Sequence, residues 1–365
     1  MKVGVITFHH AKFSYGAMLQ ALATCTVCKR YADMVELINY ENAYEQRGVK
    51  TKGTSLKERL LRQANYIARM VIYGGYKNPY QDGKKIDRIY DRLTDAHYTD
   101  VKQMSGLEYD VMITGSDQVW NPNITGGIDP AFFLDFGKAN RRISYAPSMG
   151  TYVIPEDQKQ SFAHYLARYD AISVRETFAK DQLQPLCKQE VKVVLDPTLL
   201  LTKQEWFDEL QIEEREDNGD HYILTFFVGQ GFSANWPQIA QYVDKLKLPV
   251  WNVQSHQKRA LHVDRVLCTP TVADFLRLIQ GADMVITNSF HGTAFSINFG
   301  KRFVSVLPLN NPSRIENLLT KVDLASRIEP TIQGMTESID YDKVRKNLDE
   351  LRKDSVMWLD AAMKG

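Results

Sequence analysis

The sequence has no long apolar stretch and almost no net charge. No part of its 365 residues approaches the ~20 consecutive apolar residues that are needed to span a bilayer. The apolar run at residues 3–8 is too short for a secretory signal, so we expect a cytoplasmic protein. The 45 lysines and arginines nearly balance the 44 aspartates and glutamates, and the net charge of +1 therefore favours no class of partner.

Cysteine is scarce, with four residues in the whole chain. Cys25 and Cys28 form a Cys-x-x-Cys pair, but Cys187 and Cys268 are isolated and supply no second pair for a zinc site. Redox-active pairs normally stand at a helix start, whereas this pair lies inside a predicted helix. We expect Cys25 and Cys28 to be packed helix residues, and we predict no metal site.

Two nucleotide-binding patterns are also absent. The chain has neither the Gly-x-Gly-x-x-Gly spacing of dinucleotide sites nor the Walker pattern Gly-x-x-x-x-Gly-Lys-Ser/Thr. Residues 13–17, Phe-Ser-Tyr-Gly-Ala, instead follow the first predicted strand and begin a helix. We interpret Ser14 and Gly16 as part of a turn that faces a ligand.

Short apolar, β-branched runs alternate with amphipathic stretches along the whole chain. This alternation predicts an α/β fold with parallel sheets that helices cover on both faces. The chain exceeds the ~150 residues of a typical domain, so we expect two domains that share a cleft. The predicted strands lie at residues 3–8, 35–40, 111–114, 143–146, 172–174, 191–195, 222–228, 250–253, 284–287 and 303–307.

The domain joint is predicted at Asp196-Pro197-Thr198, because proline interrupts regular strand pairing directly after a strand. We therefore assign residues 1–196 to a first domain and residues 197–335 to a second. Residues 336–365 are interpreted as a C-terminal helix that packs back on the first domain.

One segment departs from the neutral average. Residues 47–92 contain 12 lysines and arginines against 4 aspartates and glutamates, within a helical insertion at about residues 45–95. This segment is either a solvated surface or a surface that attracts an anionic acceptor, such as a lipid-linked sugar phosphate at the inner face of the membrane. No nucleic-acid motif is present, so we do not expect a nucleic-acid partner.

Polar residues with catalytic potential follow several predicted strands, where parallel sheets bind their ligands. His291 leads them, because histidine both gives and takes a proton near neutrality. It follows the strand at 284–287 together with Asn288, Ser289 and Gly292, where a helix start favours an anion. The alternative is a structural histidine.

Other candidates follow strands of the first domain. Arg175 can hold a carboxylate or phosphate with two hydrogen bonds, or instead pair with Glu176 or another acid. Asp117 can act as a base, or instead cap the next helix. Ser116, Trp120 and Asn121 lie beside Asp117, and Trp120 is suited to stack on a sugar ring. Arg314 begins a predicted helix and is either a further cation of the site or a surface residue.

Five motifs, taken in order, resemble the polysaccharide pyruvyl transferase family. They are residues 13–20 (Phe-Ser-Tyr-Gly-Ala-Met-Leu-Gln), 115–121 (Gly-Ser-Asp-Gln-Val-Trp-Asn), 173–176 (Ser-Val-Arg-Glu), 195–200 (Leu-Asp-Pro-Thr-Leu-Leu) and 287–292 (Thr-Asn-Ser-Phe-His-Gly). The resemblance fades by about residue 330. It implies two Rossmann-like domains facing a central cleft, as in GT-B glycosyltransferases.

The resemblance also implies a reaction. Phosphoenolpyruvate is the donor substrate, no cofactor or metal is required, and pyruvate is joined as a ketal to two hydroxyls of one sugar of a surface or exopolysaccharide. In this scheme His291 supplies a proton, Asp117 accepts one, and Arg175 binds the donor.

The resemblance departs from the family pattern at Ser289, where several members carry an arginine. Arg314 or a residue of the basic segment is the candidate replacement. Two other functions stay open at this stage: a GT-B glycosyltransferase that uses a nucleotide sugar, and a sugar-binding relative without turnover.

Overall fold

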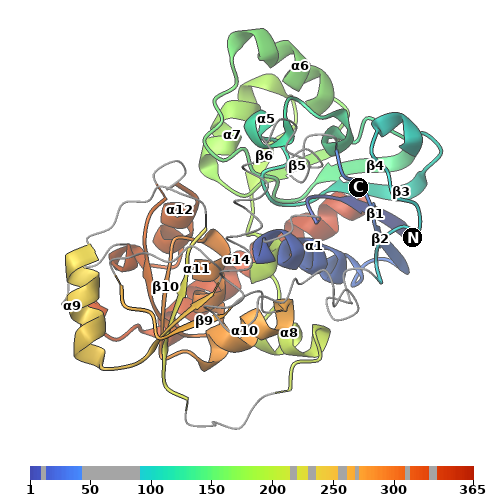
Figure 1. Ribbon diagram of the computed structural model, residues 1–365. Coiled ribbons are helices and arrows are strands. Elements are labelled where there is room, and N and C mark those ends of the chain that lie inside the picture. Colours follow the sequence, from blue (N-terminus) through green and yellow to red (C-terminus); the bar gives the residue numbers. More distant parts are fainter. Residues whose placement is uncertain are drawn as a thin grey trace, which may run out of the picture.

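The structure is a computed structural model of the chain. It describes residues 1–9, 14–42, 91–213, 220–228, 236–253, 261–267, 271–308, 313–328 and 335–365. Residues 43–90 lie outside this set, and with them most of the basic segment. Two lobes are visible in Figure 1, one built from the first half of the sequence and the other from the second.

The first lobe contains a six-stranded parallel sheet in the order β2-β1-β3-β4-β5-β6. The valines and isoleucines of its central strands are buried: Val3, Val5, Ile113 and Ile143 are 0% exposed, as expected for a sheet covered on both faces. Its strands are β1 (Lys2–Ile6), β2 (Met34–Leu37), β3 (Glu108–Thr114), β4 (Lys138–Ser144), β5 (Ala171–Val174) and β6 (Val191–Val193).

The second lobe contains a five-stranded parallel sheet in the order β11-β10-β7-β8-β9. Its strands are β7 (Ile223–Phe226), β8 (Val250–Val253), β9 (Arg265–Leu267), β10 (Met284–Thr287) and β11 (Arg302–Ser305). All ten strands predicted from the sequence are present. The short strand β9 was not predicted, because it lies at the sheet edge and begins with a charged residue.

The predicted α/β class with two parallel sheets is thus confirmed. Helices connect the strands, and several begin with a side-chain cap. Thr202 and Thr271, for example, each form a capping box with an acid three residues on. Within the described residues the α-helices are α1 (Tyr15–Cys28), α5 (Pro122–Thr125), α6 (Glu156–Leu166), α7 (Thr177–Leu183), α8 (Lys203–Glu209), α9 (Trp236–Leu246), α10 (Val272–Gly281), α11 (Phe290–Asn298), α12 (Ser313–Lys321) and α14 (Tyr341–Lys364).

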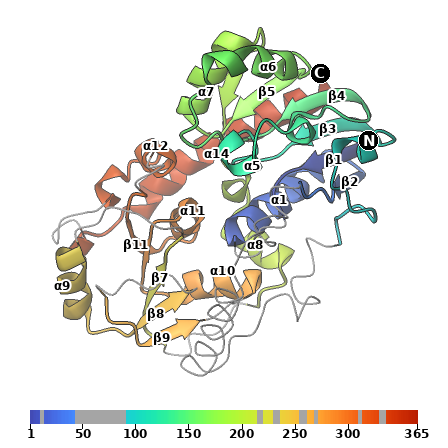
Figure 2. The ribbon, with the colours of Figure 1, turned by 45° about the horizontal axis from the view of Figure 1, so that its top comes forward.

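Helix α1 lies between the two lobes (Figures 1 and 2) and is buried along most of its length. Cys25 and Cys28 are fully buried free thiols within it, so the prediction that they are packed helix residues is confirmed. Burial raises the pKa of the Cys25 thiol to about 12 and that of Cys28 further still, which leaves both uncharged and unreactive.

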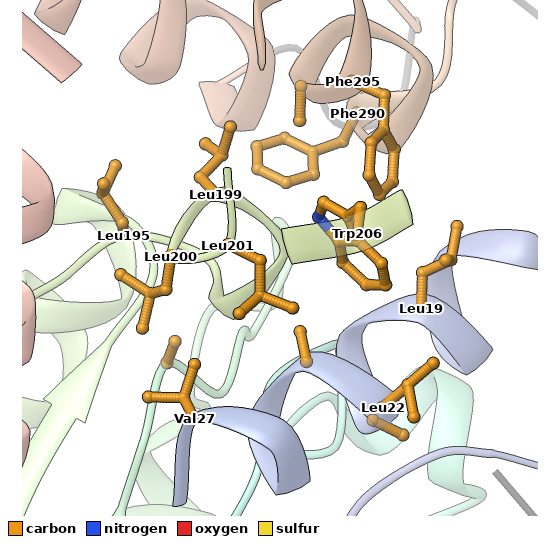
Figure 3. Close-up of a cluster of buried hydrophobic side chains, with 14 of the residues drawn as sticks. Leu19, Leu22, Val27, Leu195, Leu199, Leu200, Leu201, Trp206, Phe290 and Phe295 are labelled. Atoms are coloured by element: carbon orange, nitrogen blue, oxygen red, sulfur yellow. The ribbon is translucent and has the colours of Figure 1, made fainter. Parts of the chain in front are cut away.

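An apolar cluster joins the two lobes (Figure 3). Leu19 of α1, Trp206 of α8 and Phe295 of α11 belong to this cluster, and the Trp206 and Phe295 rings pack edge to face with centroids 5.3 Å apart. The indole N–H of Trp206 donates to the Thr198 carbonyl at 3.0 Å, so the large ring is buried without an unsatisfied polar atom.

The C-terminal helix α14 contacts both lobes. Arg352 donates to the Leu199 carbonyl at 2.6 Å and to the Asn298 side chain at 2.7 Å, at the end of α11. Further along, Ser355 donates its hydroxyl to Leu351 and accepts from the Leu195 amide, and Arg141 of β4 donates to the Ala362 carbonyl. In the described part of the chain, no helix combines the length and apolar character needed to cross a bilayer.

Candidate active site

Each sheet has a topological switch point, and the residues that follow the strands at these two points form the candidate site. In the first sheet the strand order reverses between β1 and β3, and in the second between β7 and β10. Ligands of such sheets bind beyond the carboxyl ends of the strands at these points. The chain that follows β1 and β3 supplies Gly16, Ser116 and Asp117, and the chain that follows β10 supplies His291.

Asp196, three residues after the end of β6, is the centre of the cluster. Its Oδ2 accepts hydrogen bonds from Arg175 Nη1 at 2.6 Å and Ser116 Oγ at 2.9 Å. Its Oδ1 accepts from the Thr198 amide at 3.0 Å and the Thr198 hydroxyl at 2.6 Å. Burial alone would raise the pKa of Asp196, but Arg175, His291 and Thr198 outweigh it and lower this pKa to about 2. Asp196 is therefore a permanently charged anchor.

Arg175 is almost fully buried and only partly paired. Its Nη1 is used by Asp196, whereas Nε lies 3.7 Å from Glu176 Oε2 and Nη2 lies 3.9 Å from Asp117 Oδ1, beyond hydrogen-bond range. Both nitrogens are buried without a hydrogen-bond partner. The guanidinium also lies 4.7 Å from the centre of the Phe290 ring. The alternative that Arg175 pairs with an acid is confirmed by Asp196, and its binding of a ligand anion stays a prediction, for which two donors are unused.

His291 lies in the first turn of α11, with its Nε2 buried, unpartnered and 3.9 Å from Asp196 Oδ2. Burial lowers the pKa of His291, and the negative charge of Asp196 opposes this shift. The imidazole rests directly on Gly16, because a Cβ at that position would lie 2.0 Å from His291 Nδ1. Only glycine permits this contact between the two lobes.

Asp117 has a left-handed backbone, with φ of 73°. Such a conformation is uncommon for a residue other than glycine, and it is often found at functional sites. Its carboxylate accepts from the next amide, Gln118 N, at 2.8 Å. The alternative that Asp117 caps the next helix is wrong, because α5 begins at Pro122 and its N-cap is Asn121.

Several predicted ligand residues shape the site through the backbone. Ser14 caps α1 by accepting from Ala17 N, and Ser289 caps α11 by accepting from Gly292 N. Asn288 bonds both backbone groups of Val228, which ties the end of β10 to the end of β7. At Gly292 a Cβ would lie 2.5 Å from Thr287 Oγ1, so glycine allows the helix to begin this close to the strand.

The structure does not bring Trp120 and Asn121 to the cluster. Trp120 is 1% exposed, stacks on Phe133 and donates its indole N–H to the Phe132 carbonyl at 3.0 Å. Its ring therefore has no free face for a sugar. Asn121 caps α5 and binds the Gln118 side chain at 3.0 Å.

Arg314, the second residue of α12, lies close enough to the cluster for the charges of the cluster to shift its pKa. Burial and the positive charge of Arg175 lower the pKa of Arg314 to about 10, and Asp117, Glu176 and Asp196 oppose this shift. Its Nε is buried and has no hydrogen-bond partner. Arg314 as a whole residue is half-buried, and its role as a further cation of the site stays a prediction.

Two site residues were missed by sequence reasoning. Asp196 was assigned to the domain joint, although an acid directly after a parallel strand is a site signal of the kind used for Asp117. Glu176 was considered only as a partner of Arg175, yet it is buried and accepts from Ser148 Oγ at 2.8 Å and Met149 N at 2.9 Å. Among the residues described, no three histidine, cysteine or acidic side chains gather as ligands for a metal.

A sequence model of the polysaccharide pyruvyl transferase family matches residues 15–310, which include every residue of the cluster except Arg314. The chain belongs to this family. No curated protein matches the sequence. Among solved structures, the chain resembles UDP-GlcNAc 2-epimerase from Neisseria meningitidis at 11% identity and a TM-score of 0.46, with 98% of this chain and 100% of the other covered. It resembles the E. coli heptosyltransferase WaaC at 10% identity and a TM-score of 0.39, with 96% and 100% covered.

Proposed function

We propose that this member of the family transfers the pyruvyl group of phosphoenolpyruvate to two hydroxyls of one sugar and forms a ketal. The observation that carries the proposal is the convergence of Arg175, Asp196 and His291 from separate segments on one buried cluster with unused donors. Their wide separation in sequence makes such a meeting informative, and the family supplies the reaction class.

Donor binding is assigned to Arg175 and the N-terminus of α11. The Nε and Nη2 of Arg175 are free to hold a phosphate or carboxylate, since Asp196 fixes the guanidinium through Nη1 alone. The partial positive charge at the start of α11 favours the same anion. These groups are set before the donor arrives and require no rearrangement.

His291 is assigned the proton transfer. Burial lowers its pKa in the free protein, so it is mostly neutral at pH 7. A bound dianion next to the imidazole raises this pKa again, so that donor binding itself charges the proton donor. The unpartnered Nε2 is then the atom that protonates the donor.

A proton added to the methylene carbon of the enol phosphate forms the methyl group and makes the adjacent carbon electrophilic. One sugar hydroxyl attacks that carbon and loses its proton to Asp117, the C–O bond to phosphate breaks, and a second hydroxyl of the same sugar closes the ketal ring. The two sugar hydroxyls release two protons in all. These balance the proton gained by the methyl group and the proton carried by the inorganic phosphate that leaves.

The acceptor is assigned as a saccharide of a surface or exopolysaccharide, in a lipid-linked form at the inner face of the membrane. The basic segment 47–92 is the candidate contact for such an anionic carrier. Most of this segment lies outside the described residues, so the assignment rests on its charge.

The test measures phosphate release from phosphoenolpyruvate with a panel of glycan acceptors, together with calorimetric titration of phosphoenolpyruvate and of UDP sugars. We expect His291→Asn to reduce turnover by at least 100-fold, while His164→Asn on the exposed side of α6 retains it. Binding of a UDP sugar without phosphoenolpyruvate would favour a glycosyltransferase. Binding of sugars with no phosphate release would favour a protein without turnover.

A further inference from the structure

The unpaired polar atoms of the cluster are mostly donors. Among the described residues, the buried side-chain atoms without a hydrogen-bond partner include Arg175 Nε, Arg175 Nη2 and Arg314 Nε, and the acceptor Glu176 Oε2. Burying a guanidinium N–H without a partner costs free energy, so these atoms indicate that a ligand supplies the acceptors.

The two guanidinium groups come from different lobes. Arg175 follows β5 of the first sheet, and Arg314 is in the first turn of α12, which packs against α11, the helix that contains His291. Among the charged neighbours that shift the pKa of Arg314, Arg175 has the largest effect, and both arginines keep their charge at neutral pH. Two like charges in a desolvated place repel one another, and an anion held between them removes this repulsion.

Three carboxylates lie near these two cations, but most of the carboxylate oxygens already accept hydrogen bonds from other groups. Asp196 accepts four hydrogen bonds, and Glu176 uses Oε1 for Ser148 and Met149. Asp117 accepts from Gln118 N. The carboxylates therefore orient the site, and the free donors define its ligand as one rich in acceptor oxygens.

We propose that Arg314 and Arg175 together bind the phosphate group of the donor, one guanidinium from each lobe. This inference rests on the proposed donor, phosphoenolpyruvate, and assigns the residue of the second domain that recognises its phosphate. Bidentate recognition by arginine suits a tetrahedral phosphate better than the single charge of lysine.

The experiment is calorimetric titration of the full chain with phosphoenolpyruvate and, separately, with inorganic phosphate. We expect Arg314→Met to weaken binding of both ligands at least tenfold, about 1.4 kcal/mol. Arg314→Lys should recover part of this loss. The matched control Arg345→Met removes an exposed arginine of α14 and should bind as the unchanged protein does.

The outcomes separate the two proposals. If Arg314→Met binds phosphoenolpyruvate within twofold of the unchanged protein while Arg175→Met does not bind it, the role of Arg314 is overturned and the donor site stands. The unchanged protein could instead bind inorganic phosphate but not phosphoenolpyruvate, with phosphate binding lost in both Arg175→Met and Arg314→Met. In that case the phosphate subsite stands and the proposal of phosphoenolpyruvate as the donor is overturned. If it binds neither, both proposals are overturned.

A thermal melt excludes a merely structural role. Removal of a guanidinium that repels Arg175 should leave the melting temperature of Arg314→Met unchanged or raise it. A lowered melting temperature in both Arg314→Met and Arg314→Lys, with unchanged affinity for phosphate, would assign Arg314 to packing and would also overturn the proposal.

Discussion

Replacement of Asp196 by asparagine tests the organisation of the site most directly. The substitution keeps the size of the side chain and retains one oxygen for Thr198, but it turns an amide toward Arg175. The Arg175 guanidinium then loses its 2.6 Å hydrogen bond and faces a donor. A pKa of about 2 for Asp196 in place of the ordinary 3.8 corresponds to about 2 kcal/mol of interaction. Breaking a buried pair typically costs about 3–5 kcal/mol, because the remaining charge is uncompensated.

We expect urea unfolding, followed by circular dichroism, to show a loss of about 3 kcal/mol in the free energy of unfolding of Asp196→Asn. The folded-state pKa is depressed, so the carboxylate stabilises the fold fully above pH 4, and this contribution is lost only as pH falls toward 2. The difference between variant and unchanged protein should therefore be constant from pH 5 to pH 8.

Two further variants show which property of Asp196 matters. Ser116→Ala removes one uncharged donor to Asp196 and should cost about 1 kcal/mol. Asp354→Asn, on the exposed face of α14, should cost less than about 0.5 kcal/mol. Surface substitutions typically change the free energy of unfolding by less than about 0.5 kcal/mol. A change no larger than this in Asp196→Asn would refute the assignment of Asp196 as a charged anchor.

Gly16→Ala places a methyl group on the His291 ring, and we expect a fall in kcat of about 100-fold, whereas Gly106→Ala, which meets no atom within 4 Å, should retain activity. If the reaction needs protonated His291, kcat/KM should fall as pH rises past the pKa of His291 in the free protein, which lies below 6.5. The fall in kcat should occur at a higher pH, because the bound donor raises this pKa. A fall of both parameters at the same pH would contradict the assignment. Trp206→Ala should lower the free energy of unfolding by about 3–5 kcal/mol in urea titration, since the ring is fully buried between the lobes. Cys25 and Cys28 should react with a thiol reagent only after unfolding, and labelling of the native protein at either position would contradict their burial.

The fold was largely predictable because the strands of a parallel sheet are buried on both faces. Continuous apolar runs such as residues 111–114 and 284–287 carry that signal in the sequence itself. Strand β9 was not predictable in this way, because a three-residue edge strand is stabilised by its neighbour β8 rather than by its own composition. The residues beyond each strand were equally informative, since the topology brings them to one edge.

The roles of individual site residues were less predictable. Sequence position placed Arg175, Asp117 and His291 at strand ends, but it did not distinguish Trp120, whose ring turns into the core, from residues that turn toward the cluster. The contact between Gly16 and His291 depends on how the two lobes meet, which no local pattern records. Asp196 was overlooked because the proline that follows it offered a sufficient structural explanation.

The position of Asp196 directly after the first sheet has a mechanical consequence. The segment that leaves the first sheet binds Arg175 through Asp196, and three residues later its apolar side chains enter the cluster that packs on α11. The same α11 carries His291 against Gly16. We therefore expect a change in the packing of Trp206 on Phe295 to shift α11 and to alter the distance between His291 and Asp196, although neither residue is substituted. For this reason a partly stable Trp206 variant should lose turnover more steeply than it loses folded protein, because the apolar joint and the site share one segment.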